Sequence, residues 1–423
     1  MSVSFRFIHA ADLHLDSPFR GLAKAPGQVR ERLADSTFDA LRRLTDAAVT
    51  EKVDFVVLSG DLFDAADLSL RAQLLLVREW EKLEAHGISV FAIHGNHDPL
   101  DGARADLKLP GNVHVFGAEG MDYRPAYRRS GELAAFVYGR SYGTKVVTDN
   151  MAAGYRPQPE GPFHIAMLHG NVDGDGTHDP YAPCSLADLT GNGFDYWALG
   201  HIHGRRVLHE YPHVVYAGNA QGRNPREIGA KGCYLVDVSA SRSVTLTFVP
   251  LDSVRWIEQT HPIGEAESEQ ELLRQLSAEA DRLAAEADGR SVMIRFRLTG
   301  RGALHRQLAE PAVRLALLEQ LQTEPPEREP WAFVHELVAD TEPAIPWEAL
   351  AAEDSFAGEL YRLSGRLMDN EALWSEFAKE AVAPLAGHAG LGRLLREELE
   401  ERPARWLAQA RELTLGLIGR DEE

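Results

Sequence analysis

Little in this sequence of 423 residues points to the cell exterior or to a membrane. Cysteine occurs only at Cys184 and Cys233, too few and too far apart for a disulfide scaffold or a zinc finger. No apolar stretch approaches the roughly 18 residues of a membrane span. The first residues also lack the charged and apolar segments of a secretory signal. We therefore expect a cytoplasmic protein with no membrane partner.

An excess of basic charge, typical of proteins that bind nucleic acid, is absent as well, because the formal net charge is −20. The charge is unevenly spread. Residues 1–250 carry 25 Lys and Arg against 30 Asp and Glu, whereas the remainder carries 19 against 34. The first part therefore keeps arginines that could contact a phosphate backbone, although a single arginine is more often an ordinary solvated charge. The best candidates for DNA contacts are Arg205, Arg206, Arg223 and Arg226.

Five short polar motifs each follow an apolar run in the first half of the chain. The motifs are Asp12-Leu13-His14, Gly60-Asp61-Leu62-Phe63-Asp64, Gly95-Asn96-His97-Asp98, His169-Gly170-Asn171 and Gly200-His201-Ile202-His203. The apolar runs, separated by stretches with helical spacing, predict buried strands of an α/β fold. Ligands bind beyond the carboxyl ends of such strands, so the five motifs should meet at one rim.

Carboxylates, imidazoles and a carboxamide at one rim make chemical sense around metal ions. Without cations, so many polar groups would repel one another and would be costly to bury. Imidazole with carboxylate and carbonyl oxygen suits manganese, iron, zinc or cobalt, and Asp61 is a candidate for a carboxylate shared by two ions. Two ions roughly 3.5 to 4 Å apart clamp a phosphate ester and generate hydroxide from water, which favours phosphoester hydrolysis.

The ordered series of motifs resembles the calcineurin-like metallophosphoesterase superfamily over about the first 205 residues. Each motif alone could be a tight turn or a pair of surface histidines, but five in this order favour the family. The segment from Tyr216 to Val236, which contains Gly-Asn-Ala-Gln-Gly-Arg, is similar to the SbcD and YhaO type of bacterial DNA repair exonuclease, and most to YhaO. The resemblance implies a two-sheet sandwich flanked by helices.

The resemblance also implies roles for single residues. The ligands of one metal ion would be Asp12, His14, Asp61 and His203. Those of a second would be Asp61, Asn96, His169 and His201. Manganese is the expected metal. His97 would act as general acid or stabilise the leaving group during in-line attack on phosphorus, and Asp64 would orient it, although some relatives have histidine at that place.

The chain is predicted to divide into three domains. Residues 1–251 would form the nuclease domain, residues 252–342 a small α/β capping domain that helps to place DNA, and residues 343–423 a helical, acidic region. Helices of this last region either pack on their own domain or bind a partner. The resemblance implies an SMC-like ATPase of SbcC or YhaN type as that partner, and homodimerisation through helices of the nuclease domain.

Three functions fit these observations. The first is a metal-dependent DNA nuclease in DNA repair, a 3′–5′ exonuclease with or without endonuclease activity, that acts with the ATPase. The second is a small-molecule or cyclic-nucleotide phosphodiesterase, which the acidic net charge favours. The third is a catalytically inactive binding scaffold, which the complete set of ligands disfavours.

Overall fold

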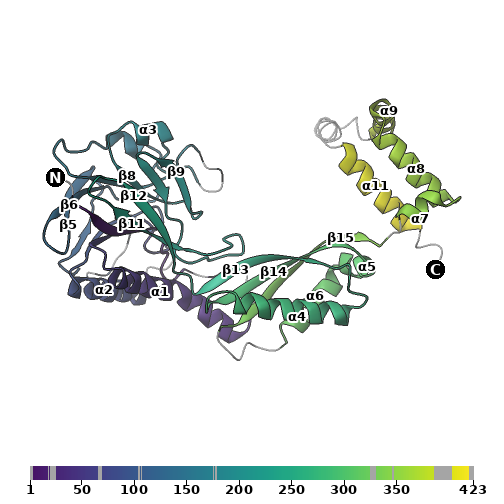
Figure 1. Ribbon diagram of the computed structural model, residues 1–423, viewed down its shortest axis with the longest axis horizontal. Helices are drawn as coiled ribbons and strands as arrows, with labels where there is room; N and C mark the ends of the chain where they lie inside the picture. The colour runs from purple at the N-terminus through teal and green to yellow at the C-terminus, as the bar shows by residue number, and fades with distance from the viewer. Residues whose placement is uncertain are drawn as a thin grey trace. The chain divides into compact units, whose positions relative to one another are not determined.

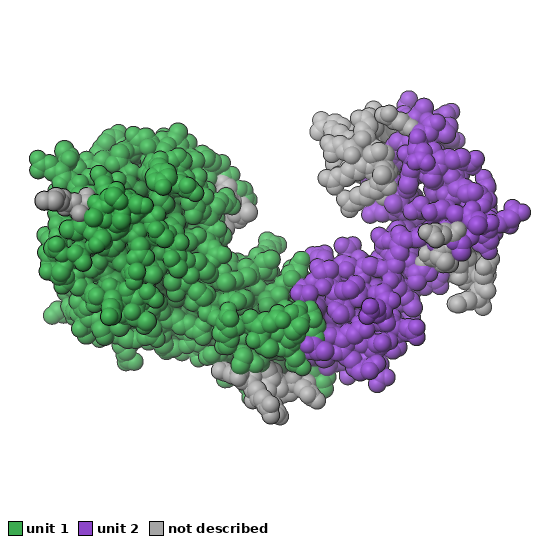
Figure 2. All heavy atoms as spheres, viewed as in Figure 1, with its two compact units in different colours: residues 1–258, 279–295, 322–335 green, residues 259–278, 296–321, 336–423 purple. Residues whose placement is uncertain are grey.

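The computed structural model describes residues 3–17, 19, 25–64, 69–102, 105, 107–174, 176, 179–323, 330–344, 347–384 and 403–418. The chain falls into two compact units (Figure 2). The first comprises residues 1–258, 279–295 and 322–335, and the second residues 259–278, 296–321 and 336–423. The division into three domains stays a prediction. Among the described residues, no helix combines the length and the apolar character needed to cross a bilayer.

Two six-stranded sheets form most of the first unit, as the predicted two-sheet sandwich requires (Figure 1). The first sheet, in spatial order, consists of β12 (Val244–Pro250), β11 (Gly232–Val238), β1 (Phe5–Ala10), β2 (Phe55–Ser59), β3 (Ser89–Ile93) and β4 (Val113–Val115). The second consists of β5 (Asp122–Tyr127), β6 (Leu133–Gly139), β7 (His164–His169), β8 (Tyr196–Gly200), β10 (His213–Tyr216) and β9 (Arg206–Glu210). Strands β1 to β4 are parallel, as are β6, β7, β8 and β10.

Both faces of the first sheet are buried, which explains the continuous apolar runs. On β1, Phe7 points into the core between the two sheets, where its ring lies 5.2 Å from that of Phe55. Ile8 points the other way and packs in a second core with residues of α1 (Gly27–Thr50) and α2 (Leu70–Ala85). An aromatic cluster that includes Trp197 covers the outer face of the second sheet, beside η1 (Met151–Gly154) and α3 (Leu186–Thr190). This is the α/β sandwich that the motifs predict.

The carboxyl ends of the two sheets meet at β2 and β8. The Ser59 hydroxyl donates to the carbonyl oxygen of Ala198 at 2.9 Å. A Cβ atom on Gly200 would lie 2.0 Å from the Ser59 carbonyl oxygen, and one on Gly60, whose φ is +92°, would lie 2.4 Å from His169 Nδ1. Glycine at both positions therefore lets the polar loops of the two sheets approach each other.

A three-stranded sheet follows, in the order β13 (Val254–Pro262), β14 (Ser291–Gly302) and β15 (Ala332–Pro343). Its helices are α4 (Glu269–Ala285), α5 (His305–Ala309) and α6 (Pro311–Leu321). Helices α5 and α6 are separate because Pro311 has no amide to donate to the preceding turn and instead starts a new helix. The C-terminal helices are α7 (Trp347–Ala352), α8 (Phe356–Met368), α9 (Glu371–Val382) and α11 (Pro403–Ile418).

Candidate metal centre

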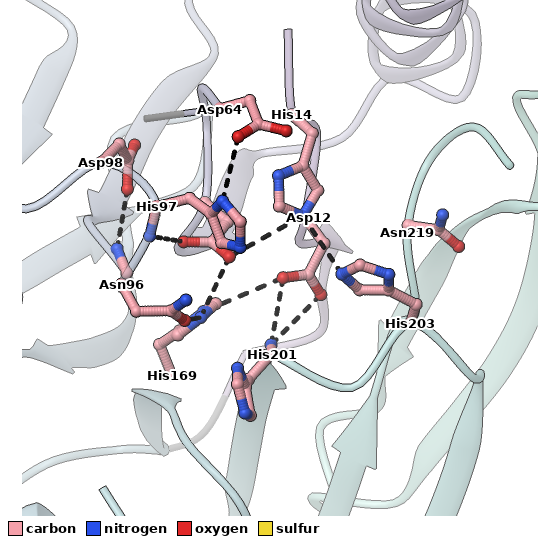
Figure 3. Close-up of polar contacts among 12 residues, drawn as sticks. Asp12, His14, Asp64, Asn96, His97, Asp98, His169, His201, His203 and Asn219 are labelled. Atoms are coloured by element: carbon pink, nitrogen blue, oxygen red, sulfur yellow. Dashed lines mark hydrogen bonds and ion pairs between the residues drawn. The ribbon is translucent and has the colours of Figure 1, made fainter. Parts of the chain in front are cut away.

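The seven predicted ligands lie at or just beyond the carboxyl ends of β1, β2, β3, β7 and β8. In Figure 3 the side chains of Asp12, His14, His169 and His203 are directed toward one another, whereas the His201 ring is directed away from them. The loops after β1 and β2 are joined by backbone hydrogen bonds. The Asp12 amide donates to the Gly60 carbonyl at 3.1 Å, and the His14 amide to the Asp61 carbonyl at 3.0 Å. Asp12, His14 and Asp61 adopt positive φ angles of 52°, 42° and 51°, and His201 adopts 95°. The backbone of these loops is thus held in conformations that L-residues rarely adopt.

The first predicted ligand set is gathered around His14. Asp12, His14 and His203 offer donor atoms that all lie within 4.8 Å of one another. His14 Nε2 lies 3.1 Å from His203 Nε2 and 3.7 Å from Asp61 Oδ2. The Asp12 carboxylate also accepts from the His201 amide at 3.0 and 3.2 Å, which fixes the loop after β8 that contains the last two histidines.

The second predicted set is gathered around His169. His169 Nε2 lies 3.3 Å from Asp61 Oδ2 and 3.0 Å from Asn96 Oδ1, and its Nδ1 lies 3.0 Å from the Ser59 carbonyl oxygen. A carbonyl only accepts, so Nδ1 carries the proton and Nε2 faces the other ligands. The His201 ring lies 5.2 Å from the His169 ring, with its Nε2 2.8 Å from the Asp179 carbonyl oxygen. Asp61 is therefore next to both sets.

These buried groups fit divalent cations. Asp12, His14, Asp61 and His169 are each at most 1% exposed. Burial raises the pKa of Asp12 and lowers that of His14 well below its usual value. Burial would also raise the pKa of Asp61, but His169 holds it well below its usual value. Two imidazole Nε2 atoms at 3.1 Å direct lone pairs at the same space, which suits a shared cation, and carboxylate, imidazole and carboxamide are suitable ligands for manganese or iron.

His97 and Asp64 form a pair beside the ligands. The His97 amide donates to Asp61 Oδ1 at 2.9 Å, and His97 Nδ1 lies 3.1 Å from Asp64 Oδ1. Asp64 Oδ2 accepts from the Ser17 hydroxyl at 2.9 Å and from Arg223 Nη1 at 3.0 Å. Burial would raise the pKa of Asp64, but the hydrogen bond to His97 and the charge of Arg223 lower it to about 2. The ionised carboxylate thus keeps the proton on Nδ1 of His97.

A cavity of about 370 Å³ opens over this centre. Its lining residues are Asp61, Asn96, His97, Gly176, Asp179, Tyr181, His201 and His203. His97 is 35% exposed at its side chain, which is enough to reach a molecule in the cavity. The arrangement can therefore hold cations at its floor and offer an acid at its wall.

Sequence reasoning missed the contacts of two acids. Glu227 Oε1 lies 2.8 Å from His203 Nδ1. Burial would raise the pKa of Glu227, but the hydrogen bond to His203 lowers it to about 2. Asp98 accepts from the Gly95 amide at 2.8 Å and shapes the turn that carries Asn96. The Gly-Asn-His-Asp motif contains Asp98 and could have pointed to it, whereas nothing local distinguishes Glu227.

The four predicted DNA contacts differ in exposure, and they stay predictions. Arg205, Arg206 and Arg226 are exposed, and the Arg205 guanidinium lies 3.6 Å from the centre of the Phe248 ring. Arg223 is only 13% exposed at its side chain because its guanidinium contacts Asp64. The Arg223 side chain therefore contacts the candidate metal centre through Asp64.

Comparisons with known proteins agree with this geometry. Residues 5–205 match the model of the calcineurin-like phosphoesterases, and residues 256–342 match that of the middle domain of metallophosphoesterase YhaO. The uncharacterized metallophosphoesterase YhaO of Bacillus subtilis is 40% identical over 81% of this chain and 83% of its own length. The DNA double-strand break repair protein Mre11 is 30% identical in Thermoplasma acidophilum and 27% identical in Saccharolobus solfataricus.

The alignment with the Thermoplasma Mre11 covers 59% of this chain and 66% of that protein, and the alignment with the Saccharolobus Mre11 covers 57% and 62%. The chain thus spans slightly less than two thirds of these two relatives. The match to YhaO extends over most of both chains and over the part beyond residue 205. The chain therefore belongs to the calcineurin-like phosphoesterase family and carries the middle domain of the YhaO metallophosphoesterases.

Proposed function

We propose that this metallophosphoesterase is a DNA nuclease that depends on two divalent metal ions, manganese being the expected metal. The observation that carries the proposal is the place of Asp61, whose carboxylate lies next to both ligand sets while it holds the backbone of His97. A phosphodiester placed in the cavity above Asp61 would meet both sets of ligands and the acid together.

The proposed ligands are Asp12, His14, Asp61 and His203 for one ion, and Asp61, Asn96, His169 and His201 for the other. When bound, the ions would polarise the phosphoryl oxygens and make water nucleophilic near neutral pH. Burial would lower the pKa of His97, but the hydrogen bond to Asp64 raises it, so the ring can carry a second proton on Nε2 and donate it to the leaving oxygen. Burial of Asp12 and His14 keeps bulk water from the floor of the centre.

Two observations support DNA as the substrate. The Mre11 relatives are named for the repair of DNA double-strand breaks. Exposed Arg205 and Arg206 follow the last proposed ligand, His203, after a single glycine, where they could contact phosphates on either side of the cleaved bond. We propose a 3′–5′ exonuclease with or without endonuclease activity. A small-molecule or cyclic-nucleotide phosphodiesterase is the second candidate, because the net charge of −20 disfavours long polyanions.

One assay separates the two candidates. The purified chain with MnCl₂ is offered end-labelled duplex DNA and bis(p-nitrophenyl) phosphate in parallel, and each reaction is repeated with EDTA. We expect both substrates to be cut with MnCl₂ and neither to be cut with EDTA. The DNA should shorten from its 3′ end. If only the small ester is cut, the DNA proposal is wrong and the second candidate stands.

We also propose a cytoplasmic homodimer that acts with an SMC-like ATPase of SbcC or YhaN type. On α2, Leu70 and Leu74 are 56% and 49% exposed, which suits a second copy of this chain. On the C-terminal helices, Phe356 and Leu413 are 73% and 68% exposed, which suits a partner with an apolar helical surface. We assign residues 252–342 the role of a cap that helps to place DNA.

A further inference from the structure

One turn, formed by residues 219–227 between β10 and β11, contacts the metal centre at two separate points. We call it the 219–227 turn. Its last residue, Glu227, reaches the ligand His203, and its middle residue, Arg223, reaches Asp64. The motifs that define the centre do not include this turn, although it touches both a ligand and the partner of the proposed acid.

Glu227 fixes the tautomer of His203. A carboxylate only accepts hydrogen bonds, so the 2.8 Å contact with Oε1 requires the proton on His203 Nδ1 and directs Nε2 toward His14. The other oxygen, Oε2, accepts from the Arg223 amide and from Asn219 Nδ2, both at 2.7 Å. The glutamate side chain is only 11% exposed, so these bonds are sheltered from water. Such partners of ligating histidines set the orientation and basicity of the ring.

Arg223 fixes Asp64 from the side opposite His97. Its Nη1 donates at 3.0 Å to Asp64 Oδ2 and at 3.0 Å to the Ser17 hydroxyl, which itself donates to Asp64 Oδ2. The second carboxylate oxygen, Oδ1, is thereby left directed at His97 Nδ1. Without the arginine, Asp64 could rotate and the ring of His97 would lose its fixed direction.

The turn itself is anchored to the start of β13. Gln221, 1% exposed, accepts from the Ser253 amide at 2.8 Å and donates to the Val254 carbonyl at 2.6 Å. Trp256, also 1% exposed, donates from its indole to the Gly222 carbonyl at 2.9 Å. A Cβ atom on Gly222 would lie 2.9 Å from the Trp256 ring, so glycine permits this contact. The backbone of the turn is therefore held against the start of β13 at Gln221 and Gly222.

We propose that Glu227 and Arg223 are positioning residues, Glu227 for the ligand His203 and Arg223 for the Asp64–His97 pair, and that Gln221 and Trp256 hold their common turn in place. The inference rests on the proposed function, since it assigns these residues to the proposed metal centre. It predicts that the two residues affect different quantities: Glu227 affects metal affinity at one site, and Arg223 affects turnover.

The test of Glu227 measures manganese affinity directly, by calorimetric titration of the metal-free full chain. In Glu227→Gln one carbonyl oxygen and one amide must serve the three donors of His203, Asn219 and Arg223, so at least one donor loses its acceptor. We expect one of two Mn²⁺ ions to bind roughly 10 to 100-fold more weakly, and the other as in the parent. Glu160→Gln, at an exposed position with the same charge change, is the matched control and should bind as the parent does.

The test of Arg223 combines the same titration with kinetics on bis(p-nitrophenyl) phosphate. For Arg223→Ala we expect unchanged Mn²⁺ affinity at both sites, a kcat lower by about tenfold and a KM close to that of the parent. Arg223→Lys should recover part of the kcat, because one ammonium group can replace the single Nη1 atom that contacts Asp64 and Ser17. Arg124→Ala, at an exposed arginine on β5, is the control.

The outcomes separate this inference from the proposed function. If the parent chain binds no Mn²⁺, the proposed metal centre itself is wrong. If the parent binds two ions and Glu227→Gln binds both equally well, or loses both together with its thermal stability, the positioning role of Glu227 is wrong. If Arg223→Ala weakens metal binding but keeps its kcat, the role of Arg223 is wrong.

Discussion

Asp61 is the residue on which both proposed metal ions depend, and replacing it by asparagine is the most direct test of a shared carboxylate. Asp61 Oδ2 lies 3.7 Å from His14 Nε2 in one set and 3.3 Å from His169 Nε2 in the other. Asparagine has the same shape and can still accept from the His97 amide through Oδ1, as aspartate does at 2.9 Å. The substitution therefore removes a negative charge between the two sets while the turn that carries His97 stays in place.

The size of the effect follows from linkage between metal binding and folding. An ion at 100 times its Kd stabilises the folded protein by about 2.7 kcal/mol, so two ions contribute about 5 kcal/mol. Each kcal/mol shifts the Tm of a domain of this size by roughly 2 to 4 °C, so saturating Mn²⁺ should raise the Tm of the parent by roughly 10 to 20 °C. In Asp61→Asn both ions lose a ligand, and we expect most of this rise to disappear.

The assay is thermal unfolding with EDTA and with MnCl₂, followed by elemental analysis of the protein after gel filtration. Glu160→Gln, which changes the same charge at an exposed position, should keep the full rise and two ions per chain. Asn96→Ala, which removes a proposed ligand of one ion only, should keep about half of the rise. If Asp61→Asn retains one ion at full affinity, the Asp61 carboxylate is not shared by two ions and the proposed assignment of ligands is wrong.

Three further predictions concern the acid, the DNA contacts and the oligomer. His97→Ala should bind both ions as the parent does but lose roughly 10² to 10⁴-fold in kcat on either substrate, and retained turnover would exclude its role as general acid. Replacing Arg205 and Arg206 together by alanine should leave hydrolysis of the small ester unchanged, weaken duplex binding, and reduce the slope of log K against log salt by about 1.8; an unchanged slope would place DNA elsewhere. Leu74→Asp should convert a dimer into a monomer in light scattering, and an unchanged mass would exclude this face of α2 as the interface.

The buried strands of the sandwich could be predicted because both faces of each strand are buried, so consecutive residues along the strand are apolar. Phe7 and Ile8 are adjacent on β1, yet each lies in a different core. The edge strand β5 was not predicted, because its residues are only partly buried and Pro125 interrupts the pattern. Proline is tolerated in β5 because this strand lies at the edge of its sheet, where one side has no hydrogen-bonded neighbour. Which strand lies at the edge depends on the order of all the strands, and the residues of β5 alone do not indicate it.

That the predicted ligands lie close together could be anticipated for a related reason: each follows a strand of one of the two sheets, and the carboxyl ends of parallel strands lie at one edge. Their role as metal ligands stays a prediction. Glu227 and Arg223 could not be anticipated, because their contacts with His203 and Asp64 depend on how the 219–227 turn is seated by Gln221 and Trp256. The carbonyl oxygen of Asp179 lies 2.8 Å from His201 Nε2. Because every residue has a backbone carbonyl, the amino-acid sequence could not indicate this contact.

The backbone of the proposed metal centre is held in place by contacts within the protein. Asp12, His14, Asp61 and His201 have φ angles from 42° to 95°, a region that costs of the order of 1 to 3 kcal/mol for each non-glycine residue. Such conformations persist only where the surroundings fix them, and here the amides of Asp12, His14 and His201 are all bonded across loops. Because the two cores of the first sheet hold β1 and β2 beneath these loops, the fold itself sustains the strained geometry of the proposed metal centre.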